Sequence, residues 1–209
     1  MFPTLYAILD AGIVGDRTTE LAGELAGVGV ELIQYRNKTG SSRTVFDACR
    51  NLARRLHGHV RFIVNDRADI AALCGADGVH TGQEDAGVEE ARAVCGRELW
   101  VGVSTHNLAQ VLAAHRTSAD YVAVGPIFPT ATKENPDPVV GLEFIHQARR
   151  LTQKAIVAIG GITLANAEDV FRAGADSVAV IRDLGAAENP GSRAAAYLKI
   201  AKQVRATRN

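Results

Sequence analysis

The sequence predicts an α/β fold, a single-domain (β/α)8 barrel of the TIM type that spans residues 1–209. Short runs rich in Val, Ile and Ala recur along the chain, and stretches with helical spacing separate them. Most of these runs are continuously apolar, as in parallel strands that are covered on both faces. No G-x-G-x-x-G motif follows the first run, which favours a closed barrel over a doubly wound open sheet.

The expected strands share a length of four to seven residues and a high content of Val, Ile and Ala. In chain order they are Leu5–Asp10, Val30–Arg36, Arg61–Asp66, Gly78–Thr81, Trp100–Thr105, Tyr121–Ile127, Ala155–Gly161 and Ser177–Asp183. The intervening stretches have apolar residues near every 3.6 positions, for example Val45, Cys49, Leu52 and Leu56. Eight strands that alternate with eight helices are what a βα barrel needs.

Three weakly similar units place an Ala-Asp pair directly before a strand, at Asp77, Asp120 and Asp176. The amino ends of barrel strands usually serve stability, so we interpret these aspartates as turn and capping residues. The chain after Pro190 predicts a final amphipathic helix over about residues 190–207.

Composition excludes several classes of function. The 23 basic and 23 acidic residues cancel, which argues against nucleic-acid and membrane partners. Three widely spaced cysteines, Cys49, Cys74 and Cys95, predict neither a disulfide framework nor a zinc site. We expect small buried thiols and a cytoplasmic protein, because no apolar run reaches the ~18 residues of a membrane span.

Polar side chains collect where the expected strands end, at the face of a barrel that carries active sites. They are Gln34, Arg36 and Lys38; Asn65 and Asp66; His80, Gln83 and Asp85; Ser104, Thr105 and His106; Thr130, Thr132 and Lys133; Gly160 and Gly161; and Arg182.

Gln34, Arg36 and Lys38 alternate along one strand, so they can share the face that points into the barrel mouth, while Tyr35 packs outward. An arginine fork, a lysine and an amide in this arrangement suit a phosphate or diphosphate. A solvated strand end is the alternative interpretation.

Asp66 and Asp85 follow adjacent strands and can meet at the barrel rim. A divalent cation would relieve their repulsion, and Mg²⁺ is usually held by one or two carboxylates together with substrate phosphates. Alternatively, each aspartate caps the helix that follows it.

Gly160 and Gly161 precede a helix and could offer backbone N–H groups to a second anion. The alternative interpretation, a tight turn with Thr163 as the helix cap, is compatible with this role. Ser104 and His106 are no hydrolase triad, because the serine lacks a G-x-S-x-G elbow and no acid orients the histidine. Ser104 is interpreted as a donor to a substrate oxygen or as a cap. The Pro-dense segment 126–138 is expected to act as a lid.

Several motifs now stand together in order along the chain. They are Gln34-Tyr35-Arg36-Asn37-Lys38, Asn65-Asp66-Arg67, Gly75 to Asp85, Gly102-Val103-Ser104, Gly125 to Lys133 and Ala158 to Ile162. Over about residues 4–185 the sequence resembles the thiamine phosphate synthase family.

The resemblance implies a βα barrel that joins 4-amino-2-methyl-5-hydroxymethylpyrimidine diphosphate to 4-methyl-5-(2-phosphoethyl)thiazole by a dissociative displacement. It implies that Gln34, Tyr35, Arg36, Asn37, Lys38, Asn65, Ser104 and Lys133 hold the pyrimidine diphosphate, and that Asp66 and Asp85 hold Mg²⁺. Thr130, Ala131, Thr132, Gly161, Ile181 and Arg182 would hold the thiazole phosphate. Arg36, Lys38, Ser104 and Lys133 would be catalytic, acting on the leaving diphosphate.

Two positions depart from the family pattern: Arg182 stands where a serine is usual, and Thr81 where an aliphatic residue is common. Two alternatives remain at this point. A related thiazole tautomerase would have no use for Arg36, Lys38 and paired aspartates, and a phosphate-binding sensor on the same scaffold would bind without turnover. A homo-oligomer is compatible with the sequence.

Overall fold

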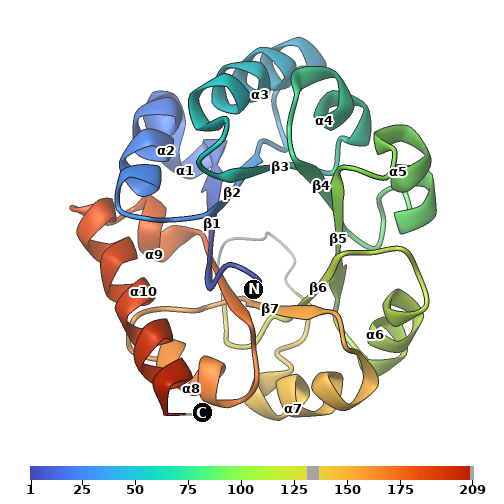
Figure 1. Ribbon diagram of the computed structural model, residues 1–209, viewed down its shortest axis with the longest axis vertical. Coiled ribbons are helices and arrows are strands. Elements are labelled where there is room, and N and C mark those ends of the chain that lie inside the picture. The colour runs from blue at the N-terminus through green and yellow to red at the C-terminus, as the bar shows by residue number, and fades with distance from the viewer. Residues whose placement is uncertain (131–136, 208–209) are drawn as a thin grey trace.

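A closed parallel barrel forms the centre of the protein (Figure 1). The computed structural model describes residues 1–130 and 137–207, and within them eight strands pair in chain order. The strands are β1 Leu5–Asp10, β2 Leu32–Arg36, β3 Arg61–Asn65, β4 Gly78–Thr81, β5 Trp100–Thr105, β6 Tyr121–Val124, β7 Ala155–Ile159 and β8 Ser177–Val180. The first and last strands also pair, with Tyr6 opposite Ala179, so the sheet has no free edge.

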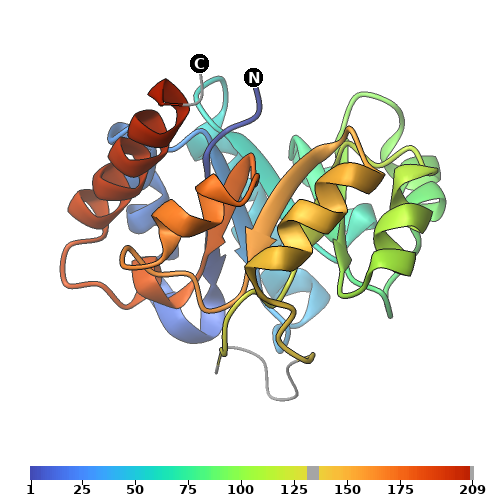
Figure 2. The ribbon, with the colours of Figure 1, turned by 90° about the horizontal axis from the view of Figure 1, so that it is seen from below.

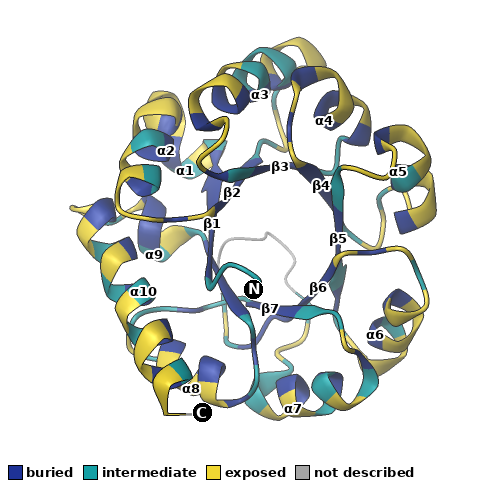
Figure 3. Ribbon diagram, viewed as in Figure 1, coloured by how far each residue is buried: buried dark blue, intermediate teal, exposed yellow. Residues whose placement is uncertain are grey.

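Helices surround the barrel and turn their exposed faces outward (Figure 3). They are α1 Ala11–Val14, the 3-10 turn η1 Gly15–Arg17, α2 Thr18–Gly27, α3 Ser42–Leu56, α4 Ala68–Cys74, α5 Val88–Cys95, α6 Leu108–His115, α7 Gly141–Leu151, α8 Ala167–Arg172, α9 Arg182–Gly185 and α10 Pro190–Ala206. Of the helices in the described ranges, none is long and apolar enough to cross a membrane. Cys49, Cys74 and Cys95 are buried and free.

The predicted fold class is confirmed, but several strands are shorter than expected. Residues 30–31, 66, 125–127, 160–161 and 181–183 lie outside them. The ladder of β6 stops before Pro126, because proline has no N–H to donate. After β8, the Gly185 N–H donates to the Ile181 carbonyl and turns the chain into α9, so Arg182 and Asp183 are helical rather than extended.

The side chains inside the barrel form an apolar layer separate from the one between the barrel and the helices. Tyr6 and Tyr121 are its largest members, at 1% and 0% exposure. The Tyr121 ring fits because Gly102 lies beside it, and a Cβ at that position would overlap the ring. At the amino ends of the strands, Phe2 stacks on Trp100 with ring centroids 5.3 Å apart. That end of the barrel is therefore filled by aromatic rings.

The three aspartates before β4, β6 and β8 each bind the strand that precedes them in the chain. Asp77 accepts from the Phe62 N–H at 2.8 Å, Asp120 from the Val101 N–H at 2.7 Å and Asp176 from the Ile156 N–H at 2.8 Å. Their role is structural, as expected, but each carboxylate secures the start of a neighbouring strand instead of capping a helix.

We expect Asp176→Ala to lower the free energy of unfolding by about 1 to 2 kcal/mol, because the Ile156 N–H and the Arg149 guanidinium both lose their acceptor. Urea unfolding followed by circular dichroism measures the change. Asp47→Ala is the matched control: its carboxylate makes only solvent-exposed ion pairs with Arg43 and Arg50, so its loss should cost much less. Equal losses in the two variants would contradict this role of Asp176.

Candidate active site

A cavity of about 500 Å³ opens at the carboxyl ends of the strands. All eight strands contribute side chains to it, and so do the segments that follow β6, β7 and β8. The N-terminus lies at the opposite end of the barrel (Figure 2). The cavity therefore occupies the face on which βα barrels build their active sites.

The sequence-predicted site residues fall into three groups. Those that line the cavity are Gln34, Arg36, Asn65, Ser104, Thr130, Gly161, Ile181 and Arg182. Those that lie outside its lining are Tyr35, Asn37, Lys38, Asp66 and Asp85. Ala131, Thr132 and Lys133 lie outside the described residues.

The side chains of Tyr35 and Asn37, which the resemblance assigns to substrate binding, lie outside the cavity lining. The Tyr35 side chain points away from the barrel interior, into the apolar layer beneath the helices, and is 5% exposed. The Asn37 amide nitrogen donates to the Tyr35 hydroxyl at 3.1 Å, and its oxygen accepts from the N–H groups of Thr39 and Gly40. Strand alternation sends Tyr35 outward, and Asn37 is used to form the turn after β2.

Arg36 is held at the cavity wall by Asp10, which ends β1. The Arg36 guanidinium donates to one Asp10 carboxylate oxygen, and the other accepts from the Gly12 N–H at 3.0 Å. Asp10 was missed by the sequence analysis, although it is the last residue of an expected strand. Its position at a carboxyl strand end was the signal that could have identified it.

Lys38, Asp66 and Asp85 form a polar cluster beside the cavity lining. The Lys38 ammonium lies 2.6 Å from Asp66 Oδ2, and Asp85 Oδ2 accepts from the Gly82 N–H at 2.9 Å. Asp66 has a positive φ of 61°, which aspartate tolerates better than most residues. This backbone conformation ends β3 and turns the carboxylate toward the cluster.

The Asp66 and Asp85 carboxylates interact, and each shifts the pKa of the other. Desolvation raises the pKa of Asp66, and the hydrogen bond with Asp85 adds to this, while Lys38 opposes it. Desolvation also acts to raise the pKa of Asp85, but the hydrogen bonds from Asp66 and from the Gly82 N–H outweigh it, so that pKa is lowered. Two adjacent carboxylates, one of which is disfavoured in its charged form, are a suitable pair of ligands for a divalent cation.

Helix capping does not explain the two aspartates. The residues that precede α4 and α5 are Arg67 and Gly87, and neither helix receives a side-chain cap. No group of three or more histidine, cysteine or acidic side chains forms a metal cluster in the described ranges. A site built on Asp66 and Asp85 would therefore need oxygen ligands from substrate or water, which is usual for Mg²⁺.

Gly160 and Gly161 form the cavity wall after β7. Their φ angles are 100° and 62°, and a Cβ on either would overlap the segment from Pro126 to Pro129. Glycine is thus required for this close approach of two backbones. The next helix, α8, begins only at Ala167, so the pair does not lie at a helix start as the sequence analysis expected.

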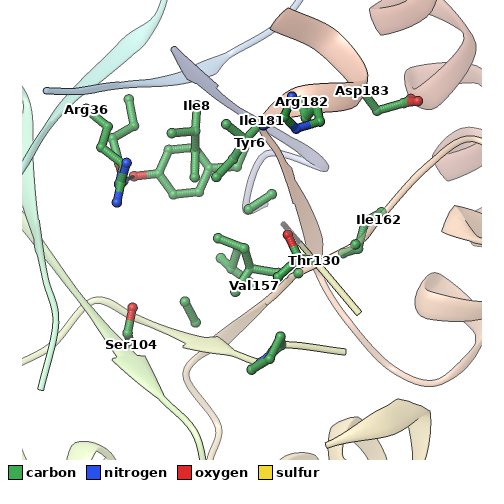
Figure 4. Close-up of a pocket in the computed structure, with 18 of the residues that line it drawn as sticks. Tyr6, Ile8, Arg36, Ser104, Thr130, Val157, Ile162, Ile181, Arg182 and Asp183 are labelled. Atoms are coloured by element: carbon green, nitrogen blue, oxygen red, sulfur yellow. Dashed lines mark hydrogen bonds between the residues drawn. The ribbon is translucent and has the colours of Figure 1, made fainter. Parts of the chain in front are cut away.

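Arginine side chains also lie on the side of the cavity formed after β8. Arg182 and Arg193 both line it, and Arg193 pairs with Asp183 at 3.4 Å. Asp183 also accepts from the Tyr197 hydroxyl at 2.7 Å. Arg182 and Asp183 lie together on this side, away from Arg36 (Figure 4). The Arg182 guanidinium makes no ion pair within residues 1–130 and 137–207.

Two further polar groups belong to the cavity. His80 hydrogen-bonds Ser104, and His106 Nδ1 lies 2.7 Å from the Gly125 carbonyl oxygen. Ser104 thus has a histidine partner, but the partner is His80 on β4, not the sequence neighbour His106. Tyr6 and Tyr121 beneath them were not predicted as site residues, because tyrosine in an apolar strand resembles ordinary core.

Comparisons with known proteins agree on one family. A family model described as thiamine monophosphate synthase matches residues 5–184. A thiamine-phosphate synthase of Koribacter versatilis is 50% identical over 203 residues, covering 95% of each chain. One from Chloroflexus aurantiacus is 45% identical, covering 88% of this chain and 86% of that protein. A thiamine phosphate pyrophosphorylase structure from Pyrococcus furiosus superposes with a TM-score of 0.87 at 32% identity, covering 96% of each chain.

We expect Asp66→Asn to raise the free energy of unfolding at pH 7 in EDTA by about 0.5 to 1 kcal/mol, the scale of solvent-screened charge pairs. An acid whose pKa is raised by folding costs stability as the pH rises through that pKa, so the gain should vanish below pH ~4, where both forms are neutral. Urea unfolding at several pH values measures it.

Asp85→Asn is the control, because it removes a carboxylate whose pKa is lowered by folding and weakens the Gly82 contact. It should not stabilise the protein. A loss of stability in Asp66→Asn at pH 7 would contradict the described pairing.

Proposed function

The chain belongs to the thiamine monophosphate synthase family, and we propose that this cavity joins a pyrimidine diphosphate to a thiazole phosphate with release of diphosphate. The observation that supports it best is the distribution of charge: Arg36 lies on one side of a largely apolar cavity and Arg182 on another, where Arg193 pairs with Asp183. Each of two anionic substrates needs its own cationic side of the cavity. The comparisons favour this transferase activity over the tautomerase and the non-catalytic barrel.

The pyrimidine diphosphate would bind on the side of Arg36. The guanidinium can donate to two phosphate oxygens at once, and its bond to Asp10 fixes its orientation before substrate arrives. Gln34, Asn65 and Ser104 also line the cavity and would bind the pyrimidine ring and the bridging oxygen. Lys38 forms an ion pair with the Asp66 carboxylate, and its ammonium group would also attract the diphosphate.

Asp66 and Asp85 would hold Mg²⁺ in this proposal. The ion would supply positive charge at the diphosphate oxygens that become negative as the bond to carbon breaks. The paired carboxylates fit this role, because a cation would stabilise the charged form of Asp66, whose pKa is raised by desolvation and by Asp85.

The apolar walls suit a dissociative displacement. Ile8, Val157 and Ile159 line the cavity. When diphosphate leaves, the pyrimidine methylene carbon becomes cationic, and water would trap it. Branched side chains displace that water, so the thiazole nitrogen can attack the carbon instead. Ser104 is placed to donate a hydrogen bond on the Arg36 side.

The thiazole phosphate would bind between Thr130, Gly161 and the start of α9 at Ile181 and Arg182. Arg182 provides a guanidinium where the family usually has a serine hydroxyl. The roles of Ala131, Thr132 and Lys133 in this proposal rest on the resemblance alone.

The direct test mixes purified protein with both substrates and detects thiamine phosphate by mass spectrometry. Product should form with Mg²⁺ and not in EDTA. Asp85→Asn should need roughly tenfold more Mg²⁺ for half-maximal rate, because one charged ligand becomes a neutral amide.

Asp47→Asn on α3 is the matched control and should keep the Mg²⁺ dependence of the wild type. Absence of product at any Mg²⁺ concentration would refute the proposed reaction. Product formation in EDTA at the full rate would refute only the metal role.

Arg182→Ser tests the thiazole phosphate side. Loss of one charge-assisted hydrogen bond should raise the KM for thiazole phosphate about tenfold and leave the KM for the pyrimidine diphosphate unchanged. Steady-state kinetics with each substrate varied in turn measures both constants. Arg172→Ser on the outer helix α8 is the control. An unchanged KM in Arg182→Ser would mean that this guanidinium does not contact the phosphate.

A further inference from the structure

A chain of hydrogen bonds crosses the barrel interior along the floor of the cavity. Gln34 Nε2 lies 2.7 Å from the Tyr6 hydroxyl, which lies 2.9 Å from the Tyr121 hydroxyl. Tyr121 continues to His80 Nδ1 at 3.1 Å, and His80 Nε2 continues to Ser104 Oγ at 2.9 Å. The five side chains come from five different strands.

Most of this chain is shielded from water, and Ser104 at one end is its most exposed member. Tyr6, Tyr121 and Gln34 are 1%, 0% and 1% exposed. Gln34 and Ser104, the two ends, line the cavity on the side proposed for the pyrimidine diphosphate. The His80 and Tyr121 rings stack with centroids 5.5 Å apart, which fixes the ring that connects the buried part to Ser104.

Counting protons gives the chain a direction. Gln34 Nε2 is a donor, so the Tyr6 oxygen accepts and the Tyr6 proton goes to the Tyr121 oxygen. The Tyr121 proton then goes to His80 Nδ1, which must be unprotonated. The imidazole therefore carries its proton on Nε2 and donates it to Ser104 Oγ.

The same direction decides what each end offers to the cavity. Ser104 Oγ already accepts from His80, so its own proton is available to a substrate oxygen. Gln34 Oε1 makes no other hydrogen bond within the described ranges and is available as an acceptor. If the Gln34 amide were flipped, Oε1 would accept from the Tyr6 hydroxyl, and each hydroxyl of the chain would donate in the opposite direction. His80 would then carry its proton on Nδ1 and accept from Ser104 at Nε2. Ser104 could offer the cavity only an acceptor.

We propose that Tyr6 and Tyr121 are positioning residues that transmit the amide orientation of Gln34 to Ser104 and so hold the serine as a hydrogen-bond donor. This rests on the proposed function, in which Ser104 faces the pyrimidine diphosphate. Tyr121 lies outside the cavity lining, and the Tyr6 hydroxyl is engaged by Gln34 and Tyr121, so both tyrosines act on Ser104 through His80. A rigid, water-free chain is suited to this because each buried hydroxyl has a single acceptor.

The first test reads the histidine tautomer and needs no activity. Protein labelled with ¹⁵N-histidine gives ring nitrogen shifts by long-range ¹H–¹⁵N correlation, and His80→Gln identifies the His80 signals. In the wild type the proton should lie on Nε2. In Tyr121→Phe the Nδ1 acceptor loses its donor, and a mixture of tautomers should appear. Tyr197→Phe, which removes another buried tyrosine hydroxyl bond, should keep the wild-type tautomer.

The second test reads catalysis. Tyr121→Phe should lower kcat about tenfold, the loss expected when one hydrogen bond to the reacting group is misdirected, and leave the KM for thiazole phosphate unchanged. In a Ser104→Ala background the same substitution should have no effect on kcat, because Tyr121 acts through the serine. A merely structural tyrosine would cost the same factor in both backgrounds.

Several results would overturn the proposal: a proton on His80 Nδ1 in the wild type, an unchanged tautomer in Tyr121→Phe, or equal kcat losses with and without Ser104. If Tyr121→Phe does not fold, Tyr6→Phe breaks the chain one bond earlier and removes the influence of Gln34. It too should give mixed tautomers, and an unchanged Nε2 proton would be decisive against the proposal. Failure of the synthase assay would leave the tautomer test intact, so the two hypotheses are separated.

Discussion

Closure of the barrel between β1 and β8 is the constraint on which the rest of the structure depends. The backbone groups of every strand find partners on both sides only when Leu5, Tyr6 and Ala7 meet Val178, Ala179 and Val180. Closure also gathers the carboxyl ends of all eight strands around one cavity. For that reason, residues as distant in sequence as Gln34 and Arg182 line the same cavity.

The interior of the closed barrel divides into levels with different chemistry. Phe2 and Trp100 fill the amino end, Tyr6 and Tyr121 form a polar connection in the middle, and charged side chains stand at the mouth. Gly102 makes the middle level possible, since a larger residue would displace the Tyr121 ring. The tyrosine hydroxyls would be costly to bury singly, and pairing them lets a polar chain run beneath an apolar cavity.

Charges at the mouth are paired before any substrate is present. Ion pairs join Arg36 to Asp10, Lys38 to Asp66 and Arg193 to Asp183. The balance of 23 basic and 23 acidic residues is thus repeated within the site. Such pairing keeps the long basic side chains in place and limits their repulsion, and an anionic substrate or a cation would enter by exchanging partners. Arg182 differs, because no ion pair holds it among the described residues.

The sequence alone determined the fold class, the eight strand positions and most of the polar groups at the mouth, because strand periodicity and the barrel rule act locally along the chain. It did not determine which carboxylate meets which base. Asp10 with Arg36, and Tyr6 with Tyr121, are pairs between strands, and their contact depends on register and closure. The motif assigned Tyr35 and Asn37 to substrate binding, and the structure places the first side chain in the outer apolar layer and the second in the turn after β2. Contacts across a barrel follow from its three-dimensional closure, which no local pattern encodes.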